Sequence, residues 1–484
     1  MNKKLQAVIL AAGRSSRFKT GKSKLLEQIC SREMIIYPTK LLEKLEIPTT
    51  IVVGYQKEQV VEVIKKYHKD SINFAEQTEQ LGTGHALLCS KEFWEADDIL
   101  VMNGDTPLIP EWILKKLIEE HNKQDAEISF IKAHNTDPST GAYGRVVRSE
   151  GKIRIVEPKD FSGYIEDHPF INSGIYIIKK NFLEKTISQI NNNNNSNEFY
   201  IVDLIGLASE KGLKIGIVQA PFDLMRGVNT LKELWAAEHI KRSELIKYWM
   251  EKGVRFNVAQ NVHIDLDVEI GPGTTIGSSA QLFSGTRIGA NCEINSFCSL
   301  INCIVEDNVI IHTHCSLSNS VIKEGAQVGP FAFIKGNSVI GKNSHIGSFV
   351  EVKNSIIGED SEAKHLNFLG DAEIGNKVTI GAGTITCNNN GYEKLKTKIE
   401  DEAFIGSSNS LVAPVTIGKN AFTAAGSVIT EDVPEKALGI ARSRQINKPD
   451  YAPKIKEKIK HQSSDKKNLF IGAIKTTEST QTTE

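Results

Sequence analysis

The second half of the chain carries an aliphatic residue at every sixth position, while the positions between are mostly polar residues or glycine. Neither a helix, which repeats about every 3.6 residues, nor an ordinary strand, which repeats every two, produces this period. The pattern predicts a coil of short parallel strands with three hexads per turn and the aliphatic side chains pointing inward. An irregular all-β sandwich is the alternative. The repeated residues are Ile270, Ile276, Leu282, Ile288, Ile294 and Leu300, then Val328, Ile334, Ile340, Ile346 and Val352, and later Ile399, Ile405, Leu411 and Ile417.

Glycine follows several of these aliphatic residues, and asparagine is frequent nearby. We expect the glycines to turn the corners of the coil, because a corner needs backbone freedom that a Cβ restricts. Solenoids of this kind commonly carry acyl transfer between packed subunits. The glycines are Gly271, Gly277, Gly289, Gly341, Gly347, Gly375 and Gly381.

The first half of the chain alternates short apolar runs with helical patterns such as Glu111–His121. This alternation predicts an α/β domain with a largely parallel sheet. The homopolymeric stretch Asn191–Asn195 is interpreted as a surface loop. The predicted strands are Ala7–Leu10, Thr50–Val53, Ile99–Met102, Ile128–Ile131 and Gly174–Ile178.

A helical pattern from Thr230 to about Lys252 ends at Gly253, so we expect it to connect the two halves. The predicted division is a nucleotidyltransferase domain at 1–229, a linker helix at 230–252, a β-helix domain at 253–448 and a flexible, Lys-, Ser- and Thr-rich tail at 449–484.

The length of 484 residues also favours two domains over a single core. The 58 basic residues nearly balance the 59 acidic ones, which indicates no nucleic-acid or membrane surface. No apolar run reaches the roughly 18 residues of a transmembrane helix, and we expect a cytoplasmic protein. The seven cysteines are dispersed and odd in number, which favours free, mostly buried thiols.

The segment Leu10–Phe18 follows a predicted strand and leads to Lys24. Its small residues let backbone N–H groups approach phosphate oxygens, and Arg17 and Lys24 supply positive charge. The segment alone is also compatible with a simple tight turn. Two further stretches favour a nucleotide site.

The first of these stretches, Gln77–Ala86, offers amide and backbone groups suited to a base edge. The second, Asn103–Asp105, places a carboxylate at the end of a predicted strand, where α/β folds bind ligands and where a hard cation finds an oxygen. Asp105 otherwise caps the next turn.

These residues resemble the sugar nucleotidyltransferases, and residues 5–445 resemble the bifunctional family of N-acetylglucosamine-1-phosphate uridyltransferases/glucosamine-1-phosphate N-acetyltransferases. The resemblance implies an α/β plus all-β protein with a Rossmann-like nucleotidyltransferase domain, a connecting helix and a left-handed parallel β-helix of hexapeptide repeats. It implies the following nucleotide-binding residues: Leu10, Ala11, Ala12, Gly13, Lys24, Gln77, Gly82, Thr83, Asn103 and Gly104. For the N-acetylated sugar it implies Gly144, Glu157 and Asn172, and for Mg²⁺ it implies Asp105 and Asn229.

The implied reaction is uridylyl transfer from UTP to N-acetylglucosamine 1-phosphate with release of pyrophosphate. The attacking phosphate is already an anion, so the site needs charge neutralisation and in-line placement rather than a general base. We expect Mg²⁺, Lys24 and Arg17 to offset the developing charge. Ser15 and Ser16 stand where this family has glycine and threonine, so we expect altered local hydrogen bonding.

The repeats are interrupted by denser sequence at 329–332, 365–371 and 380–388, and function tends to lie where a scaffold departs from its own rule. His365 is the candidate base for acyl transfer, because the attacking amine must be neutral and imidazole takes a proton near neutral pH. A histidine in a solenoid is otherwise an ordinary surface residue. The resemblance implies that Glu351 orients His365 and that Lys353 and Lys335 hold the acceptor. For acetyl-CoA it implies Ala382, Asn388, Ser407, Ala425 and Arg442, the last paired with phosphates.

The implied acceptor pocket departs from the family at four positions. Lys335 replaces arginine and loses the bidentate fork, Phe368 and Asn389 replace tyrosines, and Thr379 replaces asparagine. Each lost hydrogen bond to substrate is worth about 1 to 3 kcal/mol. A weaker acetyltransferase, a shifted acceptor or a relic site remain open. We favour acetyl transfer to glucosamine 1-phosphate, because the other implied residues are kept.

Three rival hypotheses remain. In the first, the β-helix only assembles or regulates a nucleotidyltransferase, or acylates a different acceptor. In the second, His312, His314 and His345 bind zinc, as in the γ-type carbonic anhydrases. The third is a purely structural trimer. The resemblance itself implies a homotrimer with coenzyme A between chains and UTP, acetyl-CoA and the two sugar phosphates as partners.

Overall fold

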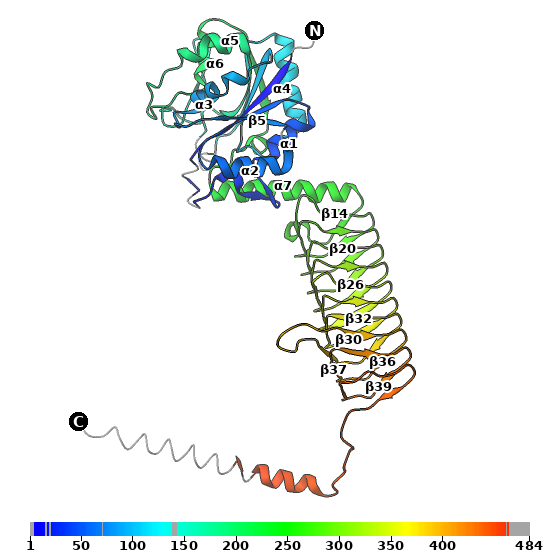
Figure 1. The fold of residues 1–484 in the computed structure, drawn as a ribbon. Coiled ribbons are helices and arrows are strands. Elements are labelled where there is room, and N and C mark those ends of the chain that lie inside the picture. Colours follow the sequence, from blue (N-terminus) through cyan, green and yellow to red (C-terminus); the bar gives the residue numbers. More distant parts are fainter. Residues whose placement is uncertain are drawn as a thin grey trace, which may run out of the picture.

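The computed structural model describes residues 4–14, 17–18, 21–69, 71–137, 143–460 and 462–463. It divides into an α/β body, a long helix and a straight solenoid (Figure 1). The helices are α1 (Ile36–Lys44), α2 (Lys57–His68), α3 (Thr83–Cys89), α4 (Glu111–Gln124), α5 (Lys180–Thr186), α6 (Asp203–Glu210) and α7 (Leu231–Glu251). Short 3₁₀ turns include η1 (Lys24–Leu26), η2 (Lys91–Phe93), η4 (Ile187–Gln189), η5 (Phe222–Met225) and η6 (Ala259–Asn261).

The α/β body is built on one sheet with the strand order β11-β7-β10-β6-β1-β4-β5, to which the β8–β9 hairpin is attached through β10. β1 pairs parallel with β4 and β6, whereas β10 runs antiparallel to β6 and β7. The predicted, largely parallel sheet is therefore present, with β10 reversed. The strands are β1 (Leu5–Ala11), β4 (Thr49–Val53), β5 (Ile72–Glu76), β6 (Asp98–Asn103), β7 (Ile128–His134), β8 (Arg145–Ser149), β9 (Lys152–Val156), β10 (Phe170–Lys179) and β11 (Ile215–Ala220).

Each face of this sheet has its own hydrophobic core, because successive side chains of a strand point to opposite sides. Ile9 and Ile51 pack with residues of α1, α2 and α4, and Val8 and Val52 pack with residues of α3, α5 and α6. The loops at the carboxyl ends of β1, β5 and β6 lie at one edge of this sheet. They form the edge at which a ligand cavity opens.

The solenoid consists of three parallel sheets, and the chain visits them in turn. The first face contains β12 (Arg255–Phe256), β15 (Thr275–Ile276), β18 (Glu293–Ile294), β21 (Ile310–Ile311), β24 (Gln327–Val328), β27 (His345–Ser348), β30 (Glu362–His365), β33 (Thr379–Ile380), β36 (Phe404–Ile405), β39 (Phe422–Thr423) and β41 (Leu438–Gly439). The second face contains β13 (His263–Ile264), β16 (Gln281–Leu282), β19 (Ser299–Ile301), β22 (Ser316–Ser318), β25 (Phe333–Lys335), β28 (Glu351–Lys353), β31 (Phe368–Gly370), β34 (Ile385–Cys387), β37 (Ser410–Val412) and β40 (Val428–Ile429). The third face contains β14 (Glu269–Ile270), β17 (Arg287–Ile288), β20 (Ile304–Val305), β23 (Val321–Ile322), β26 (Val339–Ile340), β29 (Ile356–Ile357), β32 (Ala372–Ile374), β35 (Thr397–Ile399) and β38 (Val415–Ile417).

The repeated aliphatic side chains fill the interior of this coil, and each of those predicted is at most 4 % exposed. The pattern is lost after Leu300 because some coils are shorter than others. Ile270 pairs with Ile288, 18 residues on, whereas Ile288 pairs with Val305, 17 residues on. The shorter coil shifts the buried positions by one residue, and the buried side chains that continue the interior are Val305, Ile311, Leu317 and Ile322.

The glycines that follow the aliphatic residues have a different structural role from the one predicted. None of the seven named above has a positive φ. A Cβ on Gly271 would lie 2.5 Å from the carbonyl carbon of Gly289 in the next coil, and one on Gly277 would lie 2.5 Å from the nitrogen of Ser296. Close approach of successive coils therefore requires these glycines, and the prediction that they supply backbone freedom is wrong.

Bulky residues occupy left-handed backbone positions where the first face turns into the second. We call this edge the first corner, and its residues have φ between 54° and 75°. They are Ser279, Phe297, His314, Phe331, Phe349, Leu366, Gly383, Ser408 and Gly426. Four of their side chains form an exposed ladder from Phe297 through His314 and Phe331 to Phe349, with ring centroids 4.9, 4.9 and 5.2 Å apart.

Helix α7 joins the α/β body to the solenoid (Figure 1). Ala237 packs in a cluster with Phe18 and Val228 of the body, and Ile246 packs on the core of the solenoid. A second link is made by the turn between β2 (Gln28–Ile29) and β3 (Arg32–Glu33), where Ser31 Oγ donates to Asp265 Oδ2 at 2.6 Å. The two halves therefore share apolar and polar contacts.

Residues 451–460 form a helix with exposed side chains, which the sequence pattern did not predict. It stands clear of the solenoid (Figure 1). Lysine, glutamate and isoleucine without glycine support a helix, and Pro453 is tolerated in its first turn. The rest of the predicted tail, at 464–484, lies outside the described residues. No helix in the described part of the chain has both the length and the apolar character needed to cross a bilayer.

Candidate functional site

A cavity of about 600 Å³ opens at the carboxyl ends of β1, β5 and β6. Many of the predicted nucleotide residues line it, although they come from distant parts of the sequence. The predicted residues in its wall are Leu10, Ala11, Ala12, Gly13, Lys24, Gln77, Gly82, Thr83, Asn103 and Asp105. Parallel strands bring their ends to one edge of a sheet, which is why residues separated by tens of positions meet here.

Two glycines shape this cavity in different ways. Gly82 precedes α3 with φ 108°, and a Cβ there would lie 2.6 Å from the carbonyl oxygen of Phe199. Gly104 donates its N–H to the carbonyl of Leu10 at 3.0 Å, and a Cβ there would lie 2.8 Å from Ile35 Cδ1. Gly13 meets nothing within 4 Å. Its surroundings leave space on the cavity side for a ligand.

Four predicted residues for phosphate and metal converge at the open end. Lys24 Nζ contacts Asp105 Oδ2 and donates to Asn229 Oδ1 at 2.7 Å, and Arg17 Nη2 donates to the same oxygen at 2.8 Å. A carboxylate, an amide oxygen and two cationic side chains therefore meet at one point. This combination suits a polyphosphate together with a hard divalent cation. Ser15 and Ser16 lie outside the described residues.

The predicted sugar residues lie together on the neighbouring strands. The carbonyl of Gly144 accepts from the N–H of Asn172 at 2.9 Å, and a Cβ on Gly144 would lie 3.1 Å from Glu157 Oε1. Asn172 Nδ2 donates to the hydroxyl of Tyr176 at 2.6 Å. Gly144, Glu157 and Asn172 are thus mutual neighbours, as a shared sugar site requires.

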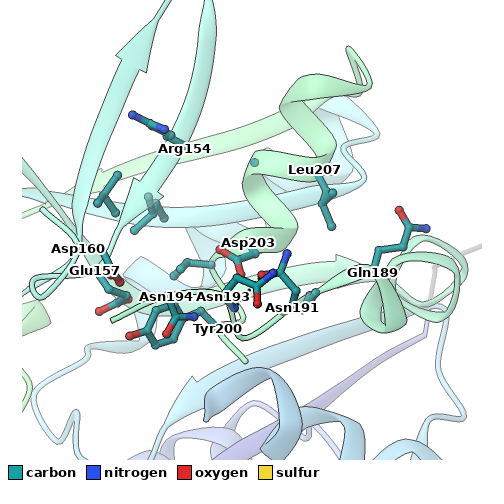
Figure 2. Close-up of a pocket in the computed structure, with 15 residues that line it drawn as sticks. Arg154, Glu157, Asp160, Gln189, Asn191, Asn193, Asn194, Tyr200, Asp203 and Leu207 are labelled. Carbon is teal, nitrogen blue, oxygen red and sulfur yellow. Dashed lines mark hydrogen bonds between the residues drawn. The ribbon is translucent and has the colours of Figure 1, made fainter. Parts of the chain in front are cut away.

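Glu157 also borders a second cavity of about 420 Å³ (Figure 2). Burial, together with Asp160 and Asp203, raises the pKa of Glu157 to about 7. Burial and Asp160 raise the pKa of Asp203, the first residue of α6, to about 6. Carboxylates this close to one another resist full ionisation near neutral pH.

The loop Asn191–Asn195 contributes Asn191, Asn193 and Asn194 to the wall of this second cavity (Figure 2). Asn195 Nδ2 donates to the carbonyl of Lys159 at 2.9 Å. The prediction of a surface loop did not anticipate that it would border the cavity beside Glu157. A homopolymeric stretch gives no sequence pattern that would reveal this contact.

Sequence reasoning did not name five residues that line the nucleotide cavity: Arg14, Leu25, Gln80, Ala86 and Glu198. Arg14 Nε donates to Gln80 Oε1 at 3.0 Å, so these two side chains close one side of the opening. Arg14 lies inside the segment that the sequence singled out, so its charge was the available signal. Gln80 lies inside the stretch Gln77–Ala86, whose amides were also singled out, whereas Glu198 carried no such signal.

In the solenoid, His365 and three predicted coenzyme A residues lie one above another along the first corner. The carbonyl of His365 accepts from Gly383 N–H at 3.2 Å, that of Ala382 from Ser408 N–H at 2.7 Å, and that of Ser407 from Gly426 N–H at 2.8 Å, next to Ala425. His365 is exposed. The corner therefore presents a histidine directly below a column of small residues. Such a column leaves room for an extended chain.

The predicted acceptor lysines lie on the second face. Lys335 pairs in register with Lys353, and Glu351 Oε1 lies 3.0 Å from Lys335 Nζ. Glu351 is thus partnered by a lysine here, and its orienting contact with His365 stays a prediction. A further residue that sequence reasoning missed is Lys394, whose ammonium group lowers the pKa of Lys353. Three lysines at one place favour binding of an anion.

Asn388 is held at the edge of the same face. Its Nδ2 donates to Asp371 Oδ2 at 2.5 Å, and Asn354 Nδ2 donates to the other oxygen of Asp371 at 2.5 Å. A Cβ on Gly370 would lie 2.8 Å from Asn388 Nδ2 and 2.7 Å from the ring of Phe368. Phe368 and Asn388 are therefore neighbours.

The four positions at which the chain departs from the family lie on different faces of the coil within one chain. Thr379 lies on the first face, where it pairs with Glu362. Lys335 and Phe368 lie on the second face, and Asn389 begins the loop that follows Asn388. The hexad period explains this, because a shift of one strand moves a residue to another face of the coil.

Two other groups are not assembled. Arg442 is exposed and lies beyond the last strand, next to Ala441, whose backbone exchanges hydrogen bonds with Ser427 and Val428. His314 is stacked between Phe297 and Phe331, and within the described residues no group of three or more histidine, cysteine or acidic side chains has the geometry to hold a metal ion. The structure therefore does not support zinc binding by His312, His314 and His345.

Known proteins resemble both the α/β body and the solenoid of this chain. Residues 7–163 match a MobA-like NTP transferase domain, residues 258–357 a GMPPB C-terminal domain, and residues 396–431 the hexapeptide repeat of succinyl-transferase. The chain is 40% identical over 453 residues to the bifunctional protein GlmU of Thermotoga petrophila, which covers 93% of this chain and 99% of that protein. It is 41% identical over 454 residues to GlmU of Thermodesulfovibrio yellowstonii, with the same coverage. The chain belongs to the family of bifunctional GlmU proteins.

Membership in the GlmU family confirms the predicted fold class, an α/β nucleotidyltransferase domain followed by a left-handed parallel β-helix of hexapeptide repeats. The match covers both halves of the chain, so the likeness is not limited to the solenoid or to the nucleotide cavity. Both candidate sites therefore belong to one family architecture.

Proposed function

We propose that this GlmU family member makes UDP-N-acetylglucosamine in two steps. The solenoid transfers acetyl from acetyl-CoA to glucosamine 1-phosphate. The α/β domain then transfers uridylyl from UTP to N-acetylglucosamine 1-phosphate and releases pyrophosphate. The observation that carries the proposal is the nucleotide cavity with Lys24 and Asp105 at its mouth, in a chain that aligns over 93% of its length with bifunctional relatives.

In the uridylyl step, the sugar phosphate attacks the α-phosphorus of UTP and pyrophosphate leaves. Lys24 and Arg17 lie at the end of the cavity where negative charge grows, and backbone N–H groups of the segment after β1 face the phosphates. The cavity holds the reactants in line, which removes most of the entropic barrier. No side chain has to remove a proton from the attacking phosphate.

The residues present suit Mg²⁺. Asp105 Oδ2 and Asn229 Oδ1 both contact the ammonium group of Lys24, so two oxygens of the type that hard cations prefer already converge on a positive charge. When bound there, Mg²⁺ neutralises charge on the phosphate oxygens. Asp105 and Asn229 are proposed as its protein ligands.

In the acetyl step, His365 removes the proton from the attacking amine of glucosamine 1-phosphate. Lys335, Lys353 and Lys394 hold its phosphate on the second face. Ala382, Ser407, Ala425, Asn388 and Arg442 are the proposed coenzyme A residues. The thiolate of coenzyme A leaves as the amide forms, and the proton on His365 returns to solvent or to the thiolate.

We propose further that the chain acts as a homotrimer. Thr379 and the acceptor lysines face different directions in one chain, so a pocket that includes both needs a second copy. The exposed ladder at the first corner supports the same interface, because it continues directly below His365. Each non-glycine residue of the first corner adopts a left-handed backbone conformation, which costs about 1 kcal/mol. Contacts in an interface between chains would offset this cost.

The predicted domain division and cytoplasmic location are part of this proposal. The decisive experiment supplies UTP, Mg²⁺ and acetyl-CoA with either glucosamine 1-phosphate or N-acetylglucosamine 1-phosphate and identifies products by mass. We expect UDP-N-acetylglucosamine from both sugars. Product from the acetylated sugar alone would instead favour a solenoid that only assembles the enzyme or that takes another acceptor.

A further inference from the structure

The first turn of α7 contains the buried carboxylate of Glu233, which contacts the segment Gly227–Asn229. This segment, called the strap below, ends at the proposed metal ligand Asn229. Glu233 is 9 % exposed. Its Oε2 accepts from the backbone N–H of Asn229 at 2.7 Å and from Thr230 Oγ1 at 3.2 Å. Thr230 is the N-cap of α7, and its hydroxyl oxygen accepts from the N–H of Glu233 at 3.2 Å.

This arrangement differs from an ordinary capping box in one respect. In a capping box the acidic residue three positions after the N-cap bonds the N–H of the N-cap itself. Glu233 instead bonds the N–H of the preceding residue, Asn229. The same carboxylate thus serves the end of the helix and the residue whose side chain meets Asp105 and Lys24.

The strap is held at each of its three residues. The N–H of Gly227 donates to the hydroxyl of Tyr143 at 3.2 Å, and the N–H of Val228 donates to the carbonyl of Asp105 at 2.9 Å. Glu233 holds the third N–H, that of Asn229. With these bonds, the backbone of one proposed metal ligand is tied to the backbone of the other.

We infer that Glu233 is a positioning residue for the metal site, acting through the backbone of Asn229; this inference rests on the proposed role of Asn229 as a ligand. The side chain of Glu233 hydrogen-bonds the backbone N–H of Asn229. It fixes the main-chain direction from which the amide oxygen of Asn229 leaves. Groups that orient a ligand in this way typically change metal affinity tenfold to a hundredfold when removed.

The test measures Mn²⁺ binding to the full-length protein saturated with UDP-N-acetylglucosamine, followed by the electron paramagnetic resonance signal of free Mn²⁺. No turnover occurs in this mixture. We expect Glu233→Ala to weaken Mn²⁺ binding about tenfold. Glu233→Gln should restore most of it, because the amide oxygen still accepts from Asn229. Hydrogen exchange at the Asn229 amide should accelerate in Glu233→Ala only.

Thr230→Ala is the control for the cap, since it removes both hydrogen bonds of the Thr230 hydroxyl with Glu233 and keeps the carboxylate that accepts from the N–H of Asn229. A purely helix-stabilising role predicts equal losses in Thr230→Ala and Glu233→Ala, and that result would overturn the inference. Unchanged Mn²⁺ affinity in Glu233→Ala, with loss in Asp105→Ala, would also overturn it while leaving the metal site standing. If Asp105→Ala binds Mn²⁺ as tightly as the unaltered protein, the metal site and the inference both fail.

Discussion

The α/β body and the solenoid build their sites in different ways. In the body, strand ends from β1, β5 and β6 together with η1 and the start of α3 surround one cavity within a single chain. In the solenoid, His365 and the small residues above it form a row along a corner, and the acceptor lysines form another row on the second face.

The two architectures differ in whether a single chain forms a concave site. A doubly wound sheet gathers distant residues at one edge, so a concave site arises from one chain. A coil of 17 or 18 residues stacks residues above one another, which creates stripes on a convex surface. In the proposed homotrimer, another copy of the chain faces these two stripes and closes them into a pocket.

Substitution of Asp105 should have the largest effect, because it should impair uridylyl transfer and leave acetyl transfer intact. We expect Asp105→Ala to lower uridylyl transfer by at least about 10³-fold, because the site loses one of two oxygens that converge on the cation position. Pyrophosphate release measures this step, and thiol release from acetyl-CoA should stay unchanged. Asp223→Ala is the control, an exposed carboxylate of the same body paired with Arg226. Near-normal pyrophosphate release would remove Asp105 from the site.

His365 tests the other half of the comparison. His365→Ala should lower acetyl transfer by about 10²- to 10³-fold through loss of the general base, with uridylyl transfer unaffected. His345→Ala, one coil earlier on the same face, is the matched control and should change acetyl transfer less than twofold. Equal losses in both variants would argue against His365 as the base. The same control tests the zinc hypothesis, which requires His345.

Sequence patterns predicted what depends on periodicity. The interior residues of the coil follow from the repeat of six, and the strands of the body and the strand-end position of Asp105 follow from short apolar runs that alternate with helical patterns. The segment after β1 combines small residues with positive charge, and this composition marked it as a nucleotide loop. In each case neighbours along the chain carry the signal.

Features that depend on packing between distant segments were not predictable from one sequence. Lys394 meets Lys353 only because an inserted loop folds back onto the second face, and Ile374 pairs with Ile399 across that insertion. The contact from Glu233 to Asn229 follows from a small offset of a common capping pattern. The glycines of the coil were predicted to supply backbone freedom at corners, whereas the structure requires them for close contact between coils.

The exposed ladder provides a test of whether the solenoid site needs a second chain. Phe331→Ala removes a ring that lies between His314 and Phe349, and we expect a loss of about 2 to 3 kcal/mol of association free energy. Light scattering over a dilution series should show dissociation at higher protein concentration, with acetyl transfer falling in parallel. Uridylyl transfer should persist in the dissociated chain. Trp112→Ala, an exposed aromatic residue of the body, is the control.

The smallest expected effect comes from substitution of Glu157, whose carboxyl group lies close to Asp160 and Asp203. The substitution tests whether folding raises the pKa of this group. Burial raises its pKa from 4.5 in an unfolded chain to about 7, so the folded protein retains a proton that the unfolded chain has released between these values. Stability contributed by this residue is therefore greatest below pH 4.5, falls as pH rises toward 7 and is constant above it. Glu157→Gln, which stays neutral, should be more stable than the unaltered chain by about 1 to 2 kcal/mol at pH 8, after allowance for partial exposure.

Thermal unfolding at pH 5 and pH 8 measures this difference, which corresponds to roughly 2 to 8 °C for a domain of this size. The gain in Glu157→Gln should shrink markedly at pH 5, where the native glutamate is protonated in the folded state. Glu119→Gln, an exposed glutamate of α4, should show no such pH-dependent gain. An equal gain at both pH values would mean that Glu157 is destabilising through packing rather than charge. Folding would then not raise the pKa of Glu157.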